Sequence, residues 1–149
     1  MPATASESKS PSRILVVDQE DWCREFLSSV FKLLGYEDFK LVNSVAEAMA
    51  ALEESPFDLV ITDQKQPDYQ RLLENTRTRH PATRFIVMVH PRTQTHQVFY
   101  YEQVDIVYKP LKMDEIIRKI RHALHQKQLR RAEEELRRLK QEALRLFLR

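Results

Sequence analysis

The chain has 149 residues, 42% of them hydrophobic, which is enough to bury the core of one domain. Its 24 Lys and Arg residues nearly balance its 22 Asp and Glu residues, so the overall charge gives no reason to expect a nucleic-acid partner. The single cysteine, Cys23, excludes an internal disulfide, and no apolar run reaches the roughly 18 residues of a membrane span. We therefore expect a cytoplasmic protein without a membrane partner.

The N-terminal part of the chain predicts a leader, a strand and a helix. Residues 1–12 are rich in Ser, Pro and Ala and are expected to form a disordered leader. Ile14–Val17 is a short apolar run that ends at Asp18, typical of a strand covered on both faces. A helical spacing of apolar residues follows (Cys23, Leu27, Val30 and Leu34), and Gly35 is expected just beyond the end of that helix. Cys23 is thus a predicted core residue.

The next predicted elements are a capped helix and a second buried strand. Ser44 is expected to cap a helix over Val45–Leu52, and Glu47, three residues later, completes the pattern of a capping box. The apolar run Leu59–Thr62 predicts a buried strand that ends at Asp63.

Two further helices and one further strand complete the predicted domain, which spans residues 13–124. A helix is expected from about Tyr69 to Arg79, where His80–Pro81 stops it. A helix near Thr93–Glu102 precedes the last apolar run, Ile106–Tyr108, which ends at Lys109–Pro110 and is also predicted to be covered on both faces.

The C-terminal part predicts one long helix and, over residues 125–149, a coiled-coil extension. Met113 to Leu148 contains neither Pro nor Gly, and a continuous helix of that length would extend about 54 Å. Its first turns offer an apolar face to the sheet (Ile116, Ile117, Ile120 and Leu124). Beyond them, alternating steps of three and four predict a seam at a and d positions (Leu129, Ala132, Leu136, Leu139, Ala143 and Leu146).

The charges around this seam favour a parallel homodimer. Glu135 falls at a g position and Lys140 at the following e position, a pair that attracts between parallel chains. From Lys127 onward eight Lys or Arg residues face four Glu residues, but Glu133–Glu135 interrupts the basic run. A solvated helix face is therefore expected rather than a nucleic-acid site.

Charged residues stand at the ends of three of the apolar runs, where functional side chains are expected. In an α/β sheet of parallel strands, functional groups lie beyond the carboxyl ends of the strands. Asp18, Asp63 and Lys109 should therefore meet at one edge of the sheet. A zinc site is not expected, because His90, His96, His122 and His125 show no spacing typical of metal ligands.

This arrangement resembles the receiver domain of two-component response regulators over about residues 13–124. The resemblance implies a flavodoxin-like, doubly wound, five-stranded parallel sheet of order 2-1-3-4-5. It also implies that Asp63 accepts a phosphoryl group from a kinase histidine, and that Lys109 contacts that group. Mg²⁺ would be held by Asp18, Asp63 and the backbone carbonyl of Lys65.

Several positions depart from the pattern of that family. Gln19 stands at the second acidic position, so Gln19 or Glu20 would be the further metal ligand and Mg²⁺ binding should be weak. The resemblance makes Phe85–Val89 the fourth strand, where Val89 replaces the hydroxyl residue that contacts the phosphoryl group. Ile106 replaces the aromatic switch residue. The loop after Asp63 also lacks the family's glycine. These departures are typical of an atypical receiver or a pseudo-receiver.

Two functions follow from the resemblance. In the first, the domain accepts a phosphoryl group on Asp63 from a histidine kinase or phosphotransfer protein and relays the signal through the C-terminal helix to a downstream effector. In the second, it is a phosphorylation-independent pseudo-receiver that acts as a dimerisation or protein-interaction module. An independent enzyme is not expected, since no nucleophile–base pair is visible; the activity would be at most self-phosphorylation from phosphohistidine and slow autodephosphorylation.

Overall fold

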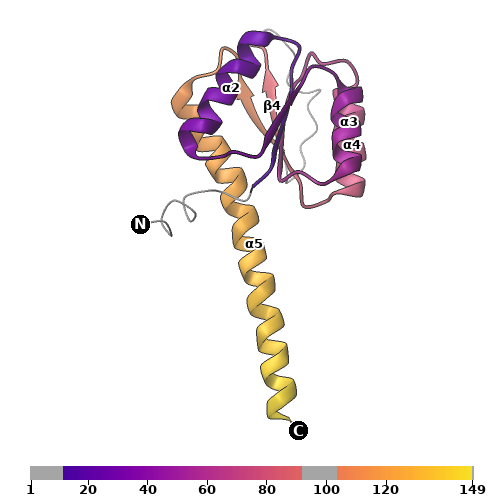
Figure 1. The fold of residues 1–149 in the computed structure, drawn as a ribbon, viewed down its shortest axis with the longest axis vertical. Helices are drawn as coiled ribbons and strands as arrows, with labels where there is room; N and C mark the ends of the chain where they lie inside the picture. The colour runs from indigo at the N-terminus through magenta and orange to yellow at the C-terminus, as the bar shows by residue number, and fades with distance from the viewer. Residues whose placement is uncertain (1–11, 92–103, 149) are drawn as a thin grey trace.

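The structure, a computed structural model, describes residues 12–91 and 104–148 and contains one parallel sheet with helices on both faces (Figure 1). The described strands have the order β2-β1-β3-β4-β5, which confirms the expected flavodoxin-like topology. In chain order the elements are β1 (Ile14–Val17), α2 (Asp21–Leu34), β2 (Phe39–Val42), α3 (Val45–Glu54), β3 (Leu59–Asp63), α4 (Tyr69–Arg79), β4 (Arg84–Val89), β5 (Val104–Tyr108) and α5 (Met113–Phe147).

The two faces of the sheet carry separate hydrophobic clusters. On one face α2 and α5 pack against the sheet, with Leu27 and Ile116 among the fully buried side chains. On the other face α3 and α4 cover it, with Leu52 and Leu72 in the core (Figure 1). Because both faces are covered, every residue of β1, β3 and β4 is buried, as their apolar runs predict.

The predicted ends of two helices are observed. Gly35 takes the left-handed conformation (φ 86°) after α2, and its amide donates to the carbonyl of Lys32. The amide of Glu47 donates to the hydroxyl of Ser44 (3.2 Å), which caps α3. The Glu47 carboxylate in turn accepts from the amide of Asn43, one residue before the position of a standard capping box.

The edges of the sheet differ from the prediction. β5 was expected to be covered on both faces, and this is wrong: only Val107 of its five residues is buried, because β5 pairs with β4 alone among the described strands. The opposite edge strand, β2, has no continuous apolar run.

The expected helix near residues 93–102 lies outside the described residues. Residues 1–11 of the predicted leader also lie outside the described residues, whereas Ser12 is described and buried.

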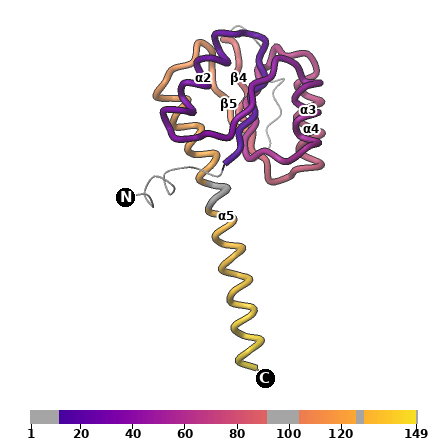
Figure 2. Tube along the Cα trace, viewed as in Figure 1, coloured from indigo at the N-terminus to yellow at the C-terminus, as the bar shows by residue number. Residues whose placement is uncertain are grey.

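Helix α5 is continuous and leaves the domain as a rod (Figure 2). Its first turns pack on the sheet through Ile116, Ile120 and Leu124, which are buried, whereas every described residue from 129 onward is exposed. One ion pair links the start of the rod to the domain, between Arg131 Nη2 and Asp58 Oδ1 (3.2 Å). None of the described helices is long and apolar enough to cross a membrane.

Candidate functional site

Backbone pairing places three charged side chains at the carboxyl edge of the sheet. The amide of Asp18 donates to the carbonyl of Val42 (3.1 Å), which extends the pairing of β1 with β2 by one residue. The amide of Lys109 donates to the carbonyl of Val89 (2.8 Å) and extends β5 along β4 in the same way. Asp63 is the last residue of β3, between them. The strand ends therefore bring together the three residues that the sequence predicts.

The ammonium group of Lys109 lies at the centre of this cluster and is buried, with 4% of its side chain exposed. Its Nζ donates to Asp18 Oδ2 (2.7 Å) and to Asp63 Oδ2 (2.5 Å). A third carboxylate also reaches it, since Nζ lies 2.7 Å from Glu20 Oε1. One positive charge thus faces three negative charges in a largely buried site.

This environment shifts the ionisation of the lysine and of two of its partners. Burial by itself lowers the pKa of Lys109, but hydrogen bonds to Asp18, Asp63 and Glu20 outweigh it and raise the pKa above its usual value. Burial opposes ionisation of Asp63, yet hydrogen bonds from Lys109 and from the Lys65 amide hold its pKa below the usual range. The hydrogen bond from Lys109 also lowers the pKa of Glu20. All three groups are therefore charged at neutral pH.

Glu20 belongs to the site, although adjacent side chains at the end of a strand are expected to diverge. Its amide donates to Asp18 Oδ1 (2.9 Å), and its side chain accepts from Trp22 Nε1 (2.7 Å). Gln19 also lines the pocket but is exposed. The chain turns into α2 immediately after Glu20, and this turn directs the Glu20 carboxylate back over the sheet edge.

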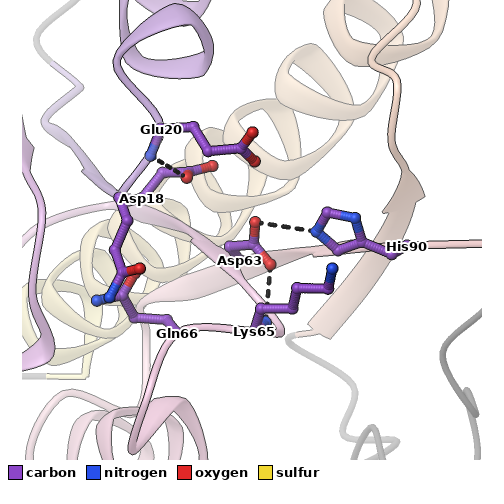
Figure 3. Close-up of a pocket in the computed structure, with 7 residues that line it drawn as sticks. Asp18, Glu20, Asp63, Lys65, Gln66 and His90 are labelled. Atoms are coloured by element: carbon purple, nitrogen blue, oxygen red, sulfur yellow. Dashed lines mark hydrogen bonds and ion pairs between the residues drawn. The ribbon is translucent and has the colours of Figure 1, made fainter.

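A histidine that the sequence did not place in the site also reaches the Asp63 carboxylate. His90 Nε2 lies 3.3 Å from Asp63 Oδ2, while the amide of Lys65 donates to Asp63 Oδ1 (2.7 Å) (Figure 3). His90 directly follows β4, so it obeys the same strand-end rule that singled out Asp63. Its position directly after a strand is the sequence feature that could have identified His90 as a site residue. The spacing between the histidines was not informative.

These residues surround a pocket of about 180 Å³ at the surface (Figure 3). Its lining comprises Asp18, Gln19, Glu20, Asp63, Lys65, Gln66 and His90. The loop beneath it has no glycine, and Asp68 takes the left-handed conformation instead (φ 63°), which Asp tolerates better than most residues. The cavity is small, polar and acidic, as expected for a site that handles a compact ion or a phosphoryl group.

The sequence matches the response regulator receiver domain over residues 14–121, which is most of the chain. The chain belongs to this family. No curated protein matches it significantly. Among solved structures it is similar to NtrX from Brucella abortus in complex with ADP, with 25% identity and a TM-score of 0.74. That alignment covers 86% of this chain but only 29% of NtrX, so the chain spans less than a third of that protein.

Two isolated receiver domains show the same fold over nearly their full length. A CheY-like receiver domain protein from Methanospirillum hungatei JF-1 is 24% identical, with a TM-score of 0.72, and the alignment covers 81% of this chain and 99% of that one. The signal receiver domain of an HD domain-containing protein from Pseudomonas fluorescens Pf-5 is 21% identical, with a TM-score of 0.71, covering 80% and 98%.

The structure shows apolar surroundings for Val89 and Ile106, the two positions at which the sequence was interpreted as differing from the family. Val89 is fully buried and packs with Tyr69 and Val87, so this position offers methyl groups where a hydroxyl is expected. Ile106 packs against the same small cluster and is partly buried. An aliphatic side chain without a polar tip cannot alternate between a buried and a hydrogen-bonded exposed state as a tyrosine can.

The charges of the pocket are compatible with a divalent cation. Asp18, Glu20 and Asp63 supply three carboxylates, and Lys109 neutralises one of them, which leaves an excess of two negative charges. Carboxylate oxygens are the ligands that Mg²⁺ prefers. The donor set therefore fits Mg²⁺, with Glu20 available where Gln19 contributes no charge.

Proposed function

We propose that this receiver accepts a phosphoryl group on Asp63 from the phosphohistidine of a histidine kinase or phosphotransfer protein. The observation that carries the proposal is the buried contact of 2.5 Å between Asp63 Oδ2 and Lys109 Nζ at the carboxyl edge of the sheet. Asp63 is ionised, which a nucleophilic carboxylate requires. Lys109, whose pKa is raised by its hydrogen bonds to the carboxylates, is protonated beside it and is suited to the charge of a transferred phosphoryl group.

The proposed reaction is an in-line transfer between two protein side chains. A carboxylate oxygen of Asp63 forms the new bond to phosphorus while the bond between phosphorus and the donor imidazole nitrogen breaks. The electron pair of that bond returns to the imidazole, which takes a proton from water. Lys109 then exchanges its contact with Asp63 for one with a phosphoryl oxygen and keeps its contact with Asp18.

Mg²⁺ would be held by Asp18, Asp63 and the backbone carbonyl of Lys65, with Glu20 or Gln19 as a further ligand. When bound, it would neutralise charge on the phosphoryl oxygens. The residues of the chain orient Asp63 without it: the Lys65 amide holds one carboxylate oxygen, and Lys109 holds the other. We propose weak Mg²⁺ binding, since the second acidic position of the family is an exposed amide here.

The test is intact-mass measurement of the full chain after incubation with acetyl phosphate and Mg²⁺. A single phosphoryl adduct should form slowly on the wild type and should be absent from Asp63→Asn, which retains the shape of the side chain but not its charge. Asp58→Asn is a matched control, because Asp58 is also a buried aspartate but lies beside the Arg13 amide, outside the pocket. An adduct that persists in Asp63→Asn would refute the assignment.

A second function, a phosphorylation-independent pseudo-receiver, is favoured by one specific observation. Val89 and Ile106, at the two positions that would respond to phosphorylation, form part of an apolar cluster. In this alternative the domain is a dimerisation or protein-interaction module, and its pocket holds a fixed ion-pair network. If neither an adduct nor binding of beryllofluoride is detected at millimolar Mg²⁺, this second function is the better one.

In either case we propose that α5 passes the signal on. Four leucines of the predicted seam are about half exposed or more: Leu129, Leu136, Leu139 and Leu146. Such a row on a continuous helix is suited to a parallel homodimer or to a downstream effector protein. We further propose that the receiver is cytoplasmic and that its own chemistry is confined to self-phosphorylation and slow autodephosphorylation.

A further inference from the structure

Three side chains of types that can bind a metal ion converge in the pocket from three different parts of the chain. Glu20 precedes α2, Asp63 ends β3 and His90 follows β4, and one ligand atom of each lies within 4.8 Å of the others. Figure 3 shows the three side chains directed toward one another. We propose that Glu20, Asp63 and His90 bind a transition-metal ion of the Zn²⁺ type, in preference to Mg²⁺.

The chemistry of the donors supports this preference. Mg²⁺ selects oxygen ligands and an octahedral shell, and it gains little from an imidazole. Zn²⁺ binds imidazole nitrogen and carboxylate oxygen together and accepts as few as four ligands. This pocket lacks a carboxylate at position 19 and has an imidazole at position 90, so both differences favour the softer ion.

The geometry of two of the ligands already suits Zn²⁺. Ligand atoms at about 2.0–2.1 Å from a tetrahedral Zn²⁺ are separated from each other by about 3.3 Å. His90 Nε2 and Asp63 Oδ2 are 3.3 Å apart. The Glu20 side chain is 41% exposed, so its carboxylate has room to turn from Lys109 toward the ion.

An independent feature of the same pocket points to a missing ligand. Gln66 lines the pocket and is only 4% exposed, yet its Oε1 is buried and has no hydrogen-bond partner among the described residues. Its Nε2 donates to the carbonyl of Asn43 (2.9 Å), which fixes the orientation of the amide. A buried acceptor without a partner is costly. Because Gln66 lies across the pocket from His90 (Figure 3), a water bound to the ion, rather than the ion itself, would satisfy it.

The positive charges nearby do not prevent binding. Lys109 Nζ now contacts Asp63 Oδ2 (2.5 Å) and Glu20 Oε1 (2.7 Å), so on metal binding it would give up these two contacts and keep its hydrogen bond to the buried Asp18. The divalent ion would then neutralise the negative charge of Glu20 and Asp63. The side chain of Lys65 is exposed, so its charge is largely screened by solvent. The inference does not depend on phosphoryl transfer, because binding of the ion requires no reaction.

The experiment is a calorimetric titration of the full chain with Zn²⁺ and, separately, with Mg²⁺. Trp22 provides a second readout, because its Nε1 donates to Glu20 Oε2 and its fluorescence should change when Glu20 moves. We expect Zn²⁺ to bind more tightly than Mg²⁺. His90→Ala should weaken Zn²⁺ binding by at least about tenfold. Loss of a residue that only hydrogen-bonds to a metal ligand already lowers metal affinity by about 10–100-fold, and His90 is proposed to bind the ion directly.

Two variants keep the result interpretable. His125→Ala removes an exposed histidine of α5 and should leave Zn²⁺ binding unchanged. His90→Gln keeps a polar side chain beside Asp63 and should lose Zn²⁺ affinity while the metal-free variant unfolds at the same urea concentration as the wild type. X-ray absorption of the Zn²⁺ complex should show imidazole scattering that His90→Gln lacks.

Equal Zn²⁺ affinity in the wild type and both His90 variants would overturn the proposal, as would a wild type that binds Mg²⁺ as tightly as Zn²⁺. The mass measurement with acetyl phosphate is a separate readout. A chain that binds Zn²⁺ through His90 but forms no adduct refutes only the phosphoryl transfer, and the reverse result refutes only the metal site.

Discussion

Replacing Lys109 by Met tests whether this lysine holds the acidic pocket together. The ammonium group is buried and is hydrogen-bonded to three carboxylates. Glu20 is partly exposed and can turn to solvent, but Asp18 and Asp63 would remain buried without a counter-ion. Breaking a buried ion pair by removing one partner costs about 3–5 kcal/mol, and we expect a loss of that size in the free energy of unfolding.

Urea denaturation of the full chain measures this loss. With a slope of about 2 kcal/mol per molar urea, typical of a small domain, the midpoint should fall by about 1.5–2.5 M. The matched control is Lys119→Met, the same substitution at a partly exposed lysine that pairs with Asp105 alone (2.8 Å) among the ion pairs of the described residues. A pair of that kind contributes about 0–1 kcal/mol.

A second result is expected for Lys109→Met, in the presence of Mg²⁺. Millimolar Mg²⁺ should raise the midpoint of Lys109→Met more than that of the wild type, because the ion would supply the charge that the substitution removes. If Lys109→Met unfolds at the same urea concentration as Lys119→Met, the carboxylates do not need the lysine and our account of the site is wrong.

Three further outcomes are expected. Gln19→Asp should bind Mg²⁺ more tightly than the wild type in the Trp22 fluorescence titration, because it restores an anionic ligand; unchanged affinity would mean that another group already fills this role. Leu136→Asp with Leu139→Asp should convert a dimer to a monomer in sedimentation experiments, whereas a persistent dimer would place the interface on the globular domain. Burial raises the pKa of the Cys23 thiol, and the charge of Asp18 adds to this, so at pH 9 Cys23 should react with iodoacetamide only after unfolding; rapid labelling of the native chain would contradict its burial.

The interior of the fold was predictable because local sequence and burial agree there. The runs that became β1, β3 and β4 are continuous and apolar, and central strands of a parallel sheet are buried on both faces. Helix α4 has the predicted bounds, and α5 ends one residue earlier than expected. The edge strands carry a weaker pattern, because each lacks a neighbour on one side. β2 was therefore not located, and the burial of β5 was overestimated.

The sequence by itself determined which residues lie at the carboxyl edge of the sheet, since Asp18, Asp63 and Lys109 each follow a short apolar run that predicts a strand. Only the tertiary structure decided what else reaches them. Glu20 and His90 reach the pocket from just beyond β1 and β4, where the direction of a side chain depends on the local backbone and not on the period of the strand. Within a strand, the alternation of side chains between the two faces of the sheet fixes the direction of each one. The residues just past the end of a strand are positioned by contacts across the sheet, which no local sequence pattern encodes.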